Sequence, residues 1–349
     1  MENDAMTEQE LEKALRTAAE ADVAVIFAGL PEIFESEGYD RTSMKLPQCQ
    51  DRLIEEVLKV QPNVVVVLHN GSPVELPWAD KVSAILEMYL GGQGVGEACD
   101  RLLYGEANPS GRLAETFPYR LEDNPSYLHF PGNGKRVLYG EDIFVGYRYY
   151  DTKKVPVRYA FGHGLSYTEF AYGDLNLSSA QMTDEDILTV SFKVKNTGKT
   201  EGKEVVQLYV ADMCGISERP VKELKGFAKV HLLPGEEKTV SMEISARDLS
   251  YYEERLGDWY APSGTYRILI GHASDDVRLH ADIIFETQKE LPLCVDFTTT
   301  FGELLDHTKT APVITELLAP LAAAAASAEG MSDEYKKLGE QVIREMPLK

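Results

Sequence analysis

The sequence contains few of the residues that build disulfide or metal sites. Its 349 residues include only 4 cysteines and 7 histidines, and neither type is clustered. Cys49, Cys99, Cys214 and Cys294 are widely spaced, with no CxxC pair among them. A disulfide framework or a zinc site is therefore not expected, and free thiols in a reducing compartment are the simplest interpretation.

Basic residues and long apolar runs are also scarce. The chain has 35 Lys and Arg residues against 57 Asp and Glu residues, which gives a formal net charge of −22. This balance argues against a nucleic-acid partner or an anionic membrane surface, and it fits a neutral substrate. No run of about 18 apolar residues suggests a membrane span. The acidic first residues lack the apolar segment of a signal peptide, so we expect a cytoplasmic protein.

Turning to what the sequence contains, residues 1–120 alternate between helix and strand patterns. Thr7 and Glu10 form a capping box ahead of a helical apolar repeat. Apolar runs predict a buried strand at 23–30 and further strands at 64–68 and 83–89, with helices at 48–60 and 98–103. The alternation predicts an α/β three-layer sandwich with a mostly parallel sheet. Because only about three strands appear, we interpret this domain as truncated at its start.

The chain changes character after residue 120. Residues 121–170 are rich in Pro, Gly and aromatic residues, and we interpret them as an ordered connector. Residues 171–288 show short alternating runs at 188–195, 205–210, 239–244, 266–270 and 277–284, separated by turn signals. This spacing is typical of a fibronectin type III-like all-β sandwich. The pattern of residues 289–349 predicts a short helical tail, which we expect to be a docking appendage.

A cluster of charged residues follows the first strand. The segment Glu35-Ser-Glu-Gly-Tyr-Asp-Arg41 places three acids, an Arg and a Gly where ligands usually bind in open α/β sheets. A carboxyl next to a second carboxyl and an Arg can serve acid/base chemistry. From composition alone, an equally good interpretation is a solvated acidic loop in which Arg41 pairs with Asp40.

A glycine-rich segment at 91–96 superficially suggests a nucleotide site. It lacks the G-x-G-x-x-G register, and no acidic residue closes a strand about 20 residues later. We therefore expect close backbone packing at a helix start, and no cofactor. The aromatic residues Tyr147, Tyr149, Tyr150 and Tyr167 are predicted to serve mainly in packing.

Ordered motifs along most of the chain resemble glycoside hydrolase family 3, the β-glucosidase and β-xylosidase family. They include Ala28-Gly-Leu-Pro31, Glu35 to Arg41, His69-Asn-Gly-Ser-Pro73, Asn108-Pro-Ser-Gly-Arg-Leu113 and Phe161-Gly-His-Gly-Leu-Ser-Tyr-Thr168. The family pattern has a TIM-like barrel, an α/β sandwich and often a fibronectin-type domain. The barrel's Ser-Asp-Trp-type segment, which carries the nucleophilic Asp, does not occur in this sequence. The resemblance therefore implies the carboxyl-terminal part of a β-glucosidase.

The resemblance also implies site residues. The family's Glu-Gly-x-Asp-Arg position falls on Glu37, which is expected to be the general acid/base of a retaining enzyme acting on a β-glucoside or related β-glycoside. Glu35 is the rival assignment, and Asp40 and Arg41 are expected to support the loop, with Arg41 holding Asp40 ionised.

Without the nucleophile, this chain alone should not turn over substrate. Two alternatives remain open: a non-catalytic module that binds carbohydrate or a protein, and a subunit that completes a separate barrel chain. Missing parts would leave an unpaired sheet edge and an uncovered apolar face. We therefore expect self-association, as a homo-oligomer, or partial instability unless a partner covers that face.

Overall fold

The computed structural model describes residues 4–215, 218–292, 294–326 and 333–348. The chain divides into two compact units. One comprises residues 1–249 with 262–286, and the other comprises residues 250–261 with 287–349. None of the helices in the described ranges is both long and apolar enough to cross a bilayer.

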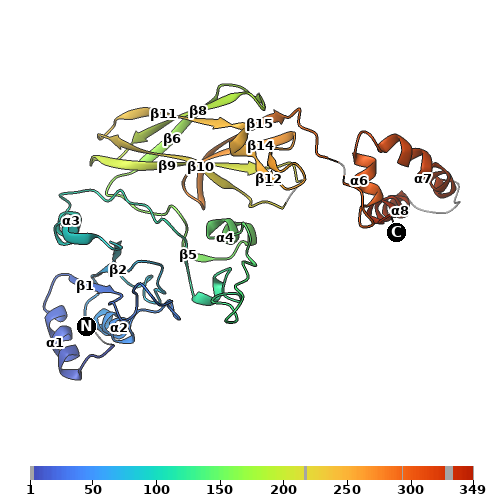
Figure 1. Cartoon of the computed structure of the whole chain (residues 1–349). Coiled ribbons are helices and arrows are strands. Elements are labelled where there is room, and N and C mark those ends of the chain that lie inside the picture. Colours follow the sequence, from blue (N-terminus) through green and yellow to red (C-terminus); the bar gives the residue numbers. More distant parts are fainter. Residues whose placement is uncertain (1–3, 216–217, 293, 327–332, 349) are drawn as a thin grey trace. The chain divides into compact units, whose positions relative to one another are not determined.

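The first unit begins with an α/β layer (Figure 1). Its parallel sheet has the order β1-β2-β3, and helices α1 and α2 pack against each other beside it. A core of aliphatic side chains with the fully buried Trp78 holds these elements together. The bounds are α1 Glu8–Ala19, β1 Ala24–Gly29, α2 Gln48–Val60, β2 Val64–His69 and β3 Ala84–Glu87.

Both helices of this layer are capped by side chains at their N-termini. The predicted capping box of Thr7 and Glu10 is present at α1. Helix α2 follows Pro47, which offers no capping side chain. Its first amides, at Gln48 and Cys49, instead donate to the carboxylate of Asp4 at 2.9 and 2.7 Å. Since the first amides of a helix have no partner within it, Asp4 ties the start of the chain to α2.

The predicted buried strand at 23–30 forms as β1, but only one of its faces is buried. Ala28 lies in the core, but Val25 and Phe27 on the opposite face are 42% and 61% exposed. Successive side chains of a strand alternate between faces, and the core that includes α1 and α2 covers only one of them. Among the described residues β1 pairs only with β2, so it forms an edge of the sheet.

The glycine-rich segment leads into α3, Val95–Leu103, through the short 3₁₀ turn η1, Gly92–Gly94. Helix α3 therefore begins three residues before the predicted helix at 98–103. A Cβ atom at Gly91 would lie 2.5 Å from Val95 Cγ2, and Gly92 has a φ of +64°. Close packing against the Val95 side chain favours glycine at position 91, and the positive φ favours it at position 92, which supports the packing interpretation of this segment.

The connector forms a few short elements. Strands β4, Phe117–Pro118, and β5, Val157–Tyr159, pair antiparallel. Between them lie the 3₁₀ turn η2, Leu121–Asp123, and helix α4, Tyr147–Lys153.

A β-sandwich completes this unit. Its two sheets have the strand orders β10-β9-β14-β15-β7 and β11-β8-β6. Fully buried residues, including Phe192, Tyr209, Tyr266 and Phe285, form its core. The bounds are β6 Phe170–Leu177, β7 Gln181–Thr183, β8 Ile187–Asn196, β9 Gly202–Asp212, β10 Glu223–Leu232, β11 Glu237–Ser245, β14 Gly264–Ala273 and β15 Asp276–Glu286, with a short helix α5, Ala246–Leu249.

A buried ionic cluster joins Arg112, which precedes the connector, to the sandwich. Glu204 of β9 is fully buried, and its carboxylate accepts from Arg112 Nη2 at 2.9 Å and from the Tyr172 hydroxyl at 2.8 Å. The ring nitrogens of His272 lie 2.6 Å from Glu204 and 2.8 Å from the Gly164 carbonyl oxygen. These partners keep the pKa of Glu204 below its usual value in spite of burial, so the carboxyl stays ionised.

The second unit contains a hairpin and helices. Strands β12, Tyr251–Glu253, and β13, Asp258–Tyr260, pair antiparallel. The predicted helical tail forms α6, Phe301–Asp306, α7, Ala311–Ala326, and α8, Asp333–Glu345.

Candidate active site

The acidic loop leaves the carboxyl end of β1, as predicted from the sequence. Gln50 of α2 fixes this exit, because its side-chain amide exchanges hydrogen bonds of 2.8 and 2.9 Å with both backbone groups of Gly29. A side chain at Gly29 would collide with the backbone of His69, since a Cβ atom there would lie 2.0 Å from the His69 carbonyl oxygen. Only glycine allows β1 and β2 to end so close together.

Glu35 is anchored to the turn that follows β2. Its carboxylate accepts from the Gly71 amide at 2.6 Å and from the Ser72 hydroxyl at 2.9 Å. Arg41 Nη1 lies 3.4 Å from the same carboxylate. With both oxygens engaged and its side chain only 20% exposed, Glu35 holds the loop to the sheet edge. This geometry favours a structural role for Glu35 over its rival assignment as acid/base.

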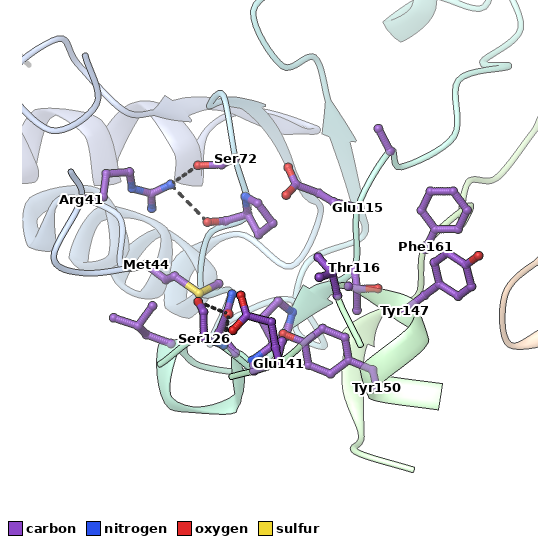
Figure 2. Close-up of a pocket in the computed structure, with 18 of the residues that line it drawn as sticks. Arg41, Met44, Ser72, Glu115, Thr116, Ser126, Glu141, Tyr147, Tyr150 and Phe161 are labelled. Carbon is purple, nitrogen blue, oxygen red and sulfur yellow. Dashed lines mark hydrogen bonds between the residues drawn. The ribbon is translucent and has the colours of Figure 1, made fainter. Parts of the chain in front are cut away.

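The predicted pairing of Arg41 with Asp40 is wrong. Arg41 Nη1 donates to Ser72 Oγ at 2.7 Å (Figure 2) and to the Pro73 carbonyl oxygen at 3.3 Å. Its carboxylate partner is Glu35. Asp40 is exposed and forms no ion pair with the described residues. The turn after β2 offers Arg41 several acceptors together, which an adjacent exposed carboxylate cannot match.

Glu37 lies on the exposed part of the loop, between anchored residues. Gly38 adopts a φ of +97°, and the Tyr39 hydroxyl donates to the carbonyl oxygen of Glu32. No residue in the described ranges forms a hydrogen bond or ion pair with the Glu37 carboxylate. Glu37 is therefore an accessible carboxyl on a loop whose flanking residues are anchored.

A buried polar cluster at the same sheet edge was not predicted. Glu87, the last residue of β3, accepts from the Tyr89 amide at 2.8 Å and from Asn70 Nδ2 at 3.2 Å. Burial raises the pKa of Glu87 to about 7 and also raises the pKa of Glu115. The sequence did hold a signal, the positions of these residues: Asn70 follows β2 and Glu87 ends β3, and the carboxyl ends of neighbouring parallel strands meet at one edge.

A hollow of about 600 Å³ opens between Arg41 and the connector. Figure 2 shows Arg41 and Ser72 on one side of it, Glu115 and Thr116 beside them, and the rings of Tyr147, Tyr150 and Phe161 on the connector side.

The predicted packing roles of the tyrosines agree with their contacts. Tyr147 stacks on Phe161 at 4.9 Å between ring centroids, and its hydroxyl accepts from the Leu224 amide at 2.7 Å. The Tyr167 hydroxyl donates to the Leu102 carbonyl oxygen at 2.7 Å. Tyr150 is buried and packs edge-on against Tyr149.

Within the described ranges, no group of three or more His, Cys, Asp and Glu side chains is arranged to hold a metal ion. The site therefore consists of carboxyl, guanidinium, hydroxyl and amide groups.

Two family models match the chain. The glycosyl hydrolase family 3 C-terminal domain matches residues 1–167, and a fibronectin type III-like domain matches residues 204–274. These matches confirm the predicted fold class, an α/β layer followed by a fibronectin-like sandwich.

Curated relatives are named as β-glucosidases. Thermostable beta-glucosidase B of Acetivibrio thermocellus is 55% identical over 283 residues, which is 81% of this chain and 38% of that protein. The beta-glucosidase of Kluyveromyces marxianus is 44% identical over 286 residues, which is 81% of this chain and 33% of that protein. The chain thus spans well under half the length of these relatives.

Solved structures of β-glucosidases are also similar to this chain. The GH3 beta-glucosidase of Bifidobacterium adolescentis superposes with a TM-score of 0.82 at 39% identity, covering 89% of this chain and 46% of that one. The Kluyveromyces marxianus beta-glucosidase in complex with glucose gives a TM-score of 0.76 at 42% identity, covering 81% of this chain and 34% of that one.

Proposed function

Because the chain belongs to glycosyl hydrolase family 3, as its carboxyl-terminal part, we propose that it supplies the general acid/base of a retaining β-glucosidase. The observation that carries the assignment is the contrast between two carboxyls on one loop. Glu35 is engaged by Gly71, Ser72 and Arg41, whereas Glu37 is exposed and has no described partner.

In the proposed mechanism Glu37 acts twice. It first protonates the glycosidic oxygen as the leaving group departs, while a nucleophilic carboxylate attacks the anomeric carbon from the other face. It then removes a proton from the water that hydrolyses the glycosyl-enzyme. The nucleophile comes from a barrel domain outside these 349 residues, in the same polypeptide or in another chain. The two carboxyls would lie about 5–5.5 Å apart in the assembled site.

The first experiment measures hydrolysis of aryl β-glucosides by the protein assembled with a family 3 barrel. Glu37→Gln should lower kcat by about 10²- to 10⁴-fold for a poor leaving group, because proton donation is lost. The loss should be smaller for a nitrophenyl leaving group, and added azide should restore turnover by attacking the glycosyl-enzyme without a general base. Unchanged hydrolysis of the poor substrate would contradict the assignment.

Glu32→Gln is the matched control. Glu32 is an exposed carboxyl of the same loop, so its neutralisation should leave turnover unchanged. The 349-residue chain alone should show no turnover, and activity that Glu37→Gln abolishes there would place a nucleophile within this chain.

We also propose that the protein acts in the cytoplasm. The cysteines support this location, since none of the four described cysteines forms a disulfide and Cys49 and Cys99 are buried. Localisation of the tagged protein in cell fractions would test it.

A further inference from the structure

The turn that follows β2, residues 70–73, holds the acidic loop on both sides of Glu37, and we call it the anchoring turn. Its amide and hydroxyl groups donate to the Glu35 carboxylate at 2.6 and 2.9 Å, and its oxygen atoms accept from Arg41 Nη1 at 2.7 and 3.3 Å. Glu35 precedes Glu37 by two residues, and Arg41 follows it by four. The position of Glu37 therefore depends on where the anchoring turn lies.

Asn70 fixes the anchoring turn and ties it to the neighbouring strand. Its side chain is fully buried, and its Nδ2 atom donates to the Ser72 carbonyl oxygen at 3.0 Å and to Glu87 Oε2 at 3.2 Å. The first hydrogen bond closes the turn on itself. The second crosses to the end of β3, which pairs with β2. Asn70 thus links the anchoring turn to Glu87.

Glu87 is itself held in place by its other oxygen. Glu87 Oε1 accepts from the Tyr89 amide at 2.8 Å. Tyr89 has a φ of +48°, a left-handed conformation that is uncommon for residues other than glycine. Such conformations persist where the surrounding structure holds them. One oxygen of Glu87 therefore fixes the carboxylate itself, and the other oxygen holds Asn70.

The burial of Asn70 shows that its hydrogen bonds matter. Asn70 Oδ1 is buried and has no hydrogen-bond partner among the described residues. An unpaired buried amide oxygen is unfavourable, and an apolar side chain of similar size would avoid this cost. The advantage of an asparagine at this position therefore comes from the two hydrogen bonds that its Nδ2 atom donates.

We propose that Asn70 and Glu87 are positioning residues for the acid/base carboxyl. Glu87 holds Asn70, Asn70 holds the anchoring turn, and the anchoring turn holds the loop on both sides of Glu37. The effect on turnover rests on the proposed acid/base role of Glu37, whereas the tether is a property of this chain alone.

Exchanging the donor and the acceptor tests the hydrogen bond between positions 70 and 87. Asn70→Asp places an acceptor where Nδ2 donates, and Glu87→Gln places an amide where Oε2 accepts, so each single change removes the bond. In the double variant the new amide can donate to the new carboxylate, and its oxygen remains available to the Tyr89 amide. The double variant therefore restores the bond in the opposite direction and keeps the net charge.

Trypsin cleavage after Arg41 measures the tether in the purified 349-residue chain. The Arg41 side chain is only 16% exposed and is bonded to the anchoring turn, so cleavage requires it to leave the turn. Each single variant should be cleaved there about three- to tenfold faster, the value of one hydrogen bond. The double variant should be cleaved more slowly than either single variant.

Asn63→Ala is the matched control. Asn63 is an exposed asparagine at the opposite end of β2, and its Nδ2 atom donates to the Asp22 carbonyl oxygen at 3.3 Å. This variant should be cleaved after Arg41 at the rate of the unmodified chain. If Asn70→Asp alone fails to fold, folding of the double variant would show that the bond has been restored.

The same variants, assembled with a family 3 barrel, test the consequence for turnover. Each single change should lower kcat about three- to tenfold for a poor leaving group and less for a nitrophenyl leaving group, with KM unchanged, because only the proton donor is displaced. The double variant should recover most of the loss.

The outcomes separate the tether from the proposed catalytic function. Additive effects of the two changes in the double variant, or cleavage after Arg41 at an unchanged rate in both single variants, would overturn the positioning role. If cleavage responds as expected but Glu37→Gln leaves turnover of the poor substrate unchanged, the acid/base assignment fails and the tether stands.

Discussion

At the scale of single residues, Glu35 connects the candidate proton donor to the sheet. Glu35→Gln should lower the free energy of unfolding by about 1–3 kcal/mol, because an amide cannot accept on both sides as the carboxylate does from Gly71 and Ser72. Urea denaturation of the chain measures this loss. Glu32→Gln, on the same loop, should leave the midpoint unchanged, and equal midpoints for both variants would show that Glu35 is not an anchor.

Glu87 should make the free energy of unfolding depend on pH. Its folded pKa of about 7 lies above the value of about 4.3 expected in the unfolded chain. The folded state thus binds this proton more tightly, so the free energy of unfolding should fall as pH rises from about 4 to about 7. Glu87→Gln should flatten the decline by on the order of 2 kcal/mol, as measured by urea unfolding at pH 5 and pH 8. An unchanged difference between the two pH values would contradict the prediction.

At the scale of elements, the sequence predicts periodic segments well and long-range contacts poorly. The helix predicted at 48–60 forms as α2, Gln48–Val60, because its apolar spacing depends only on the helix itself. Strand β10, Glu223–Leu232, was not predicted, since its exposed alternate residues and the irregular pairing near Gly226 obscure the pattern.

The same limit applies to the candidate site. The acidic loop was identified from local sequence and Glu37 from the family resemblance, and the catalytic role of Glu37 stays a prediction. The partner of Arg41 was predicted incorrectly because Ser72 and Pro73 lie about thirty residues away in the chain. Their approach depends on how β1 and β2 pair, which local composition does not encode.

The buried ion pair between Arg112 and Glu204 of β9 can be tested at this scale. Arg112→Ala should destabilise the chain by about 3–5 kcal/mol, because Glu204 would remain as a buried charge without its cation. Chemical denaturation followed by tryptophan fluorescence measures the change. Arg267→Ala removes the partly exposed ion pair between Arg267 of β14 and Asp282 of β15, and it should have no measurable effect. A similarly small effect of Arg112→Ala would indicate that the remaining partners of Glu204 suffice.

At the scale of the whole molecule, the uncovered face of β1 should govern the association state. Exposed apolar side chains on an edge strand favour pairing with another chain. We expect light scattering to show self-association of the chain, and Phe27→Ser to reduce it. Phe227→Ser, at a residue 71% exposed on the sandwich, is the control and should leave the mass distribution unchanged. A monodisperse monomer with a cooperative melt would contradict the expectation.

The cap that Asp4 places on α2 has a consequence for hydrogen exchange. The first amides of a helix usually exchange rapidly with solvent, because no residue within the helix accepts from them. Here the amides of Gln48 and Cys49 are bonded to Asp4, and these same bonds lower the pKa of the Asp4 carboxyl. Both amides should therefore exchange slowly at neutral pH, and Asp4→Ala should make them exchange fast. Deuterium uptake at these two sites thus reports directly whether Asp4 is docked on α2.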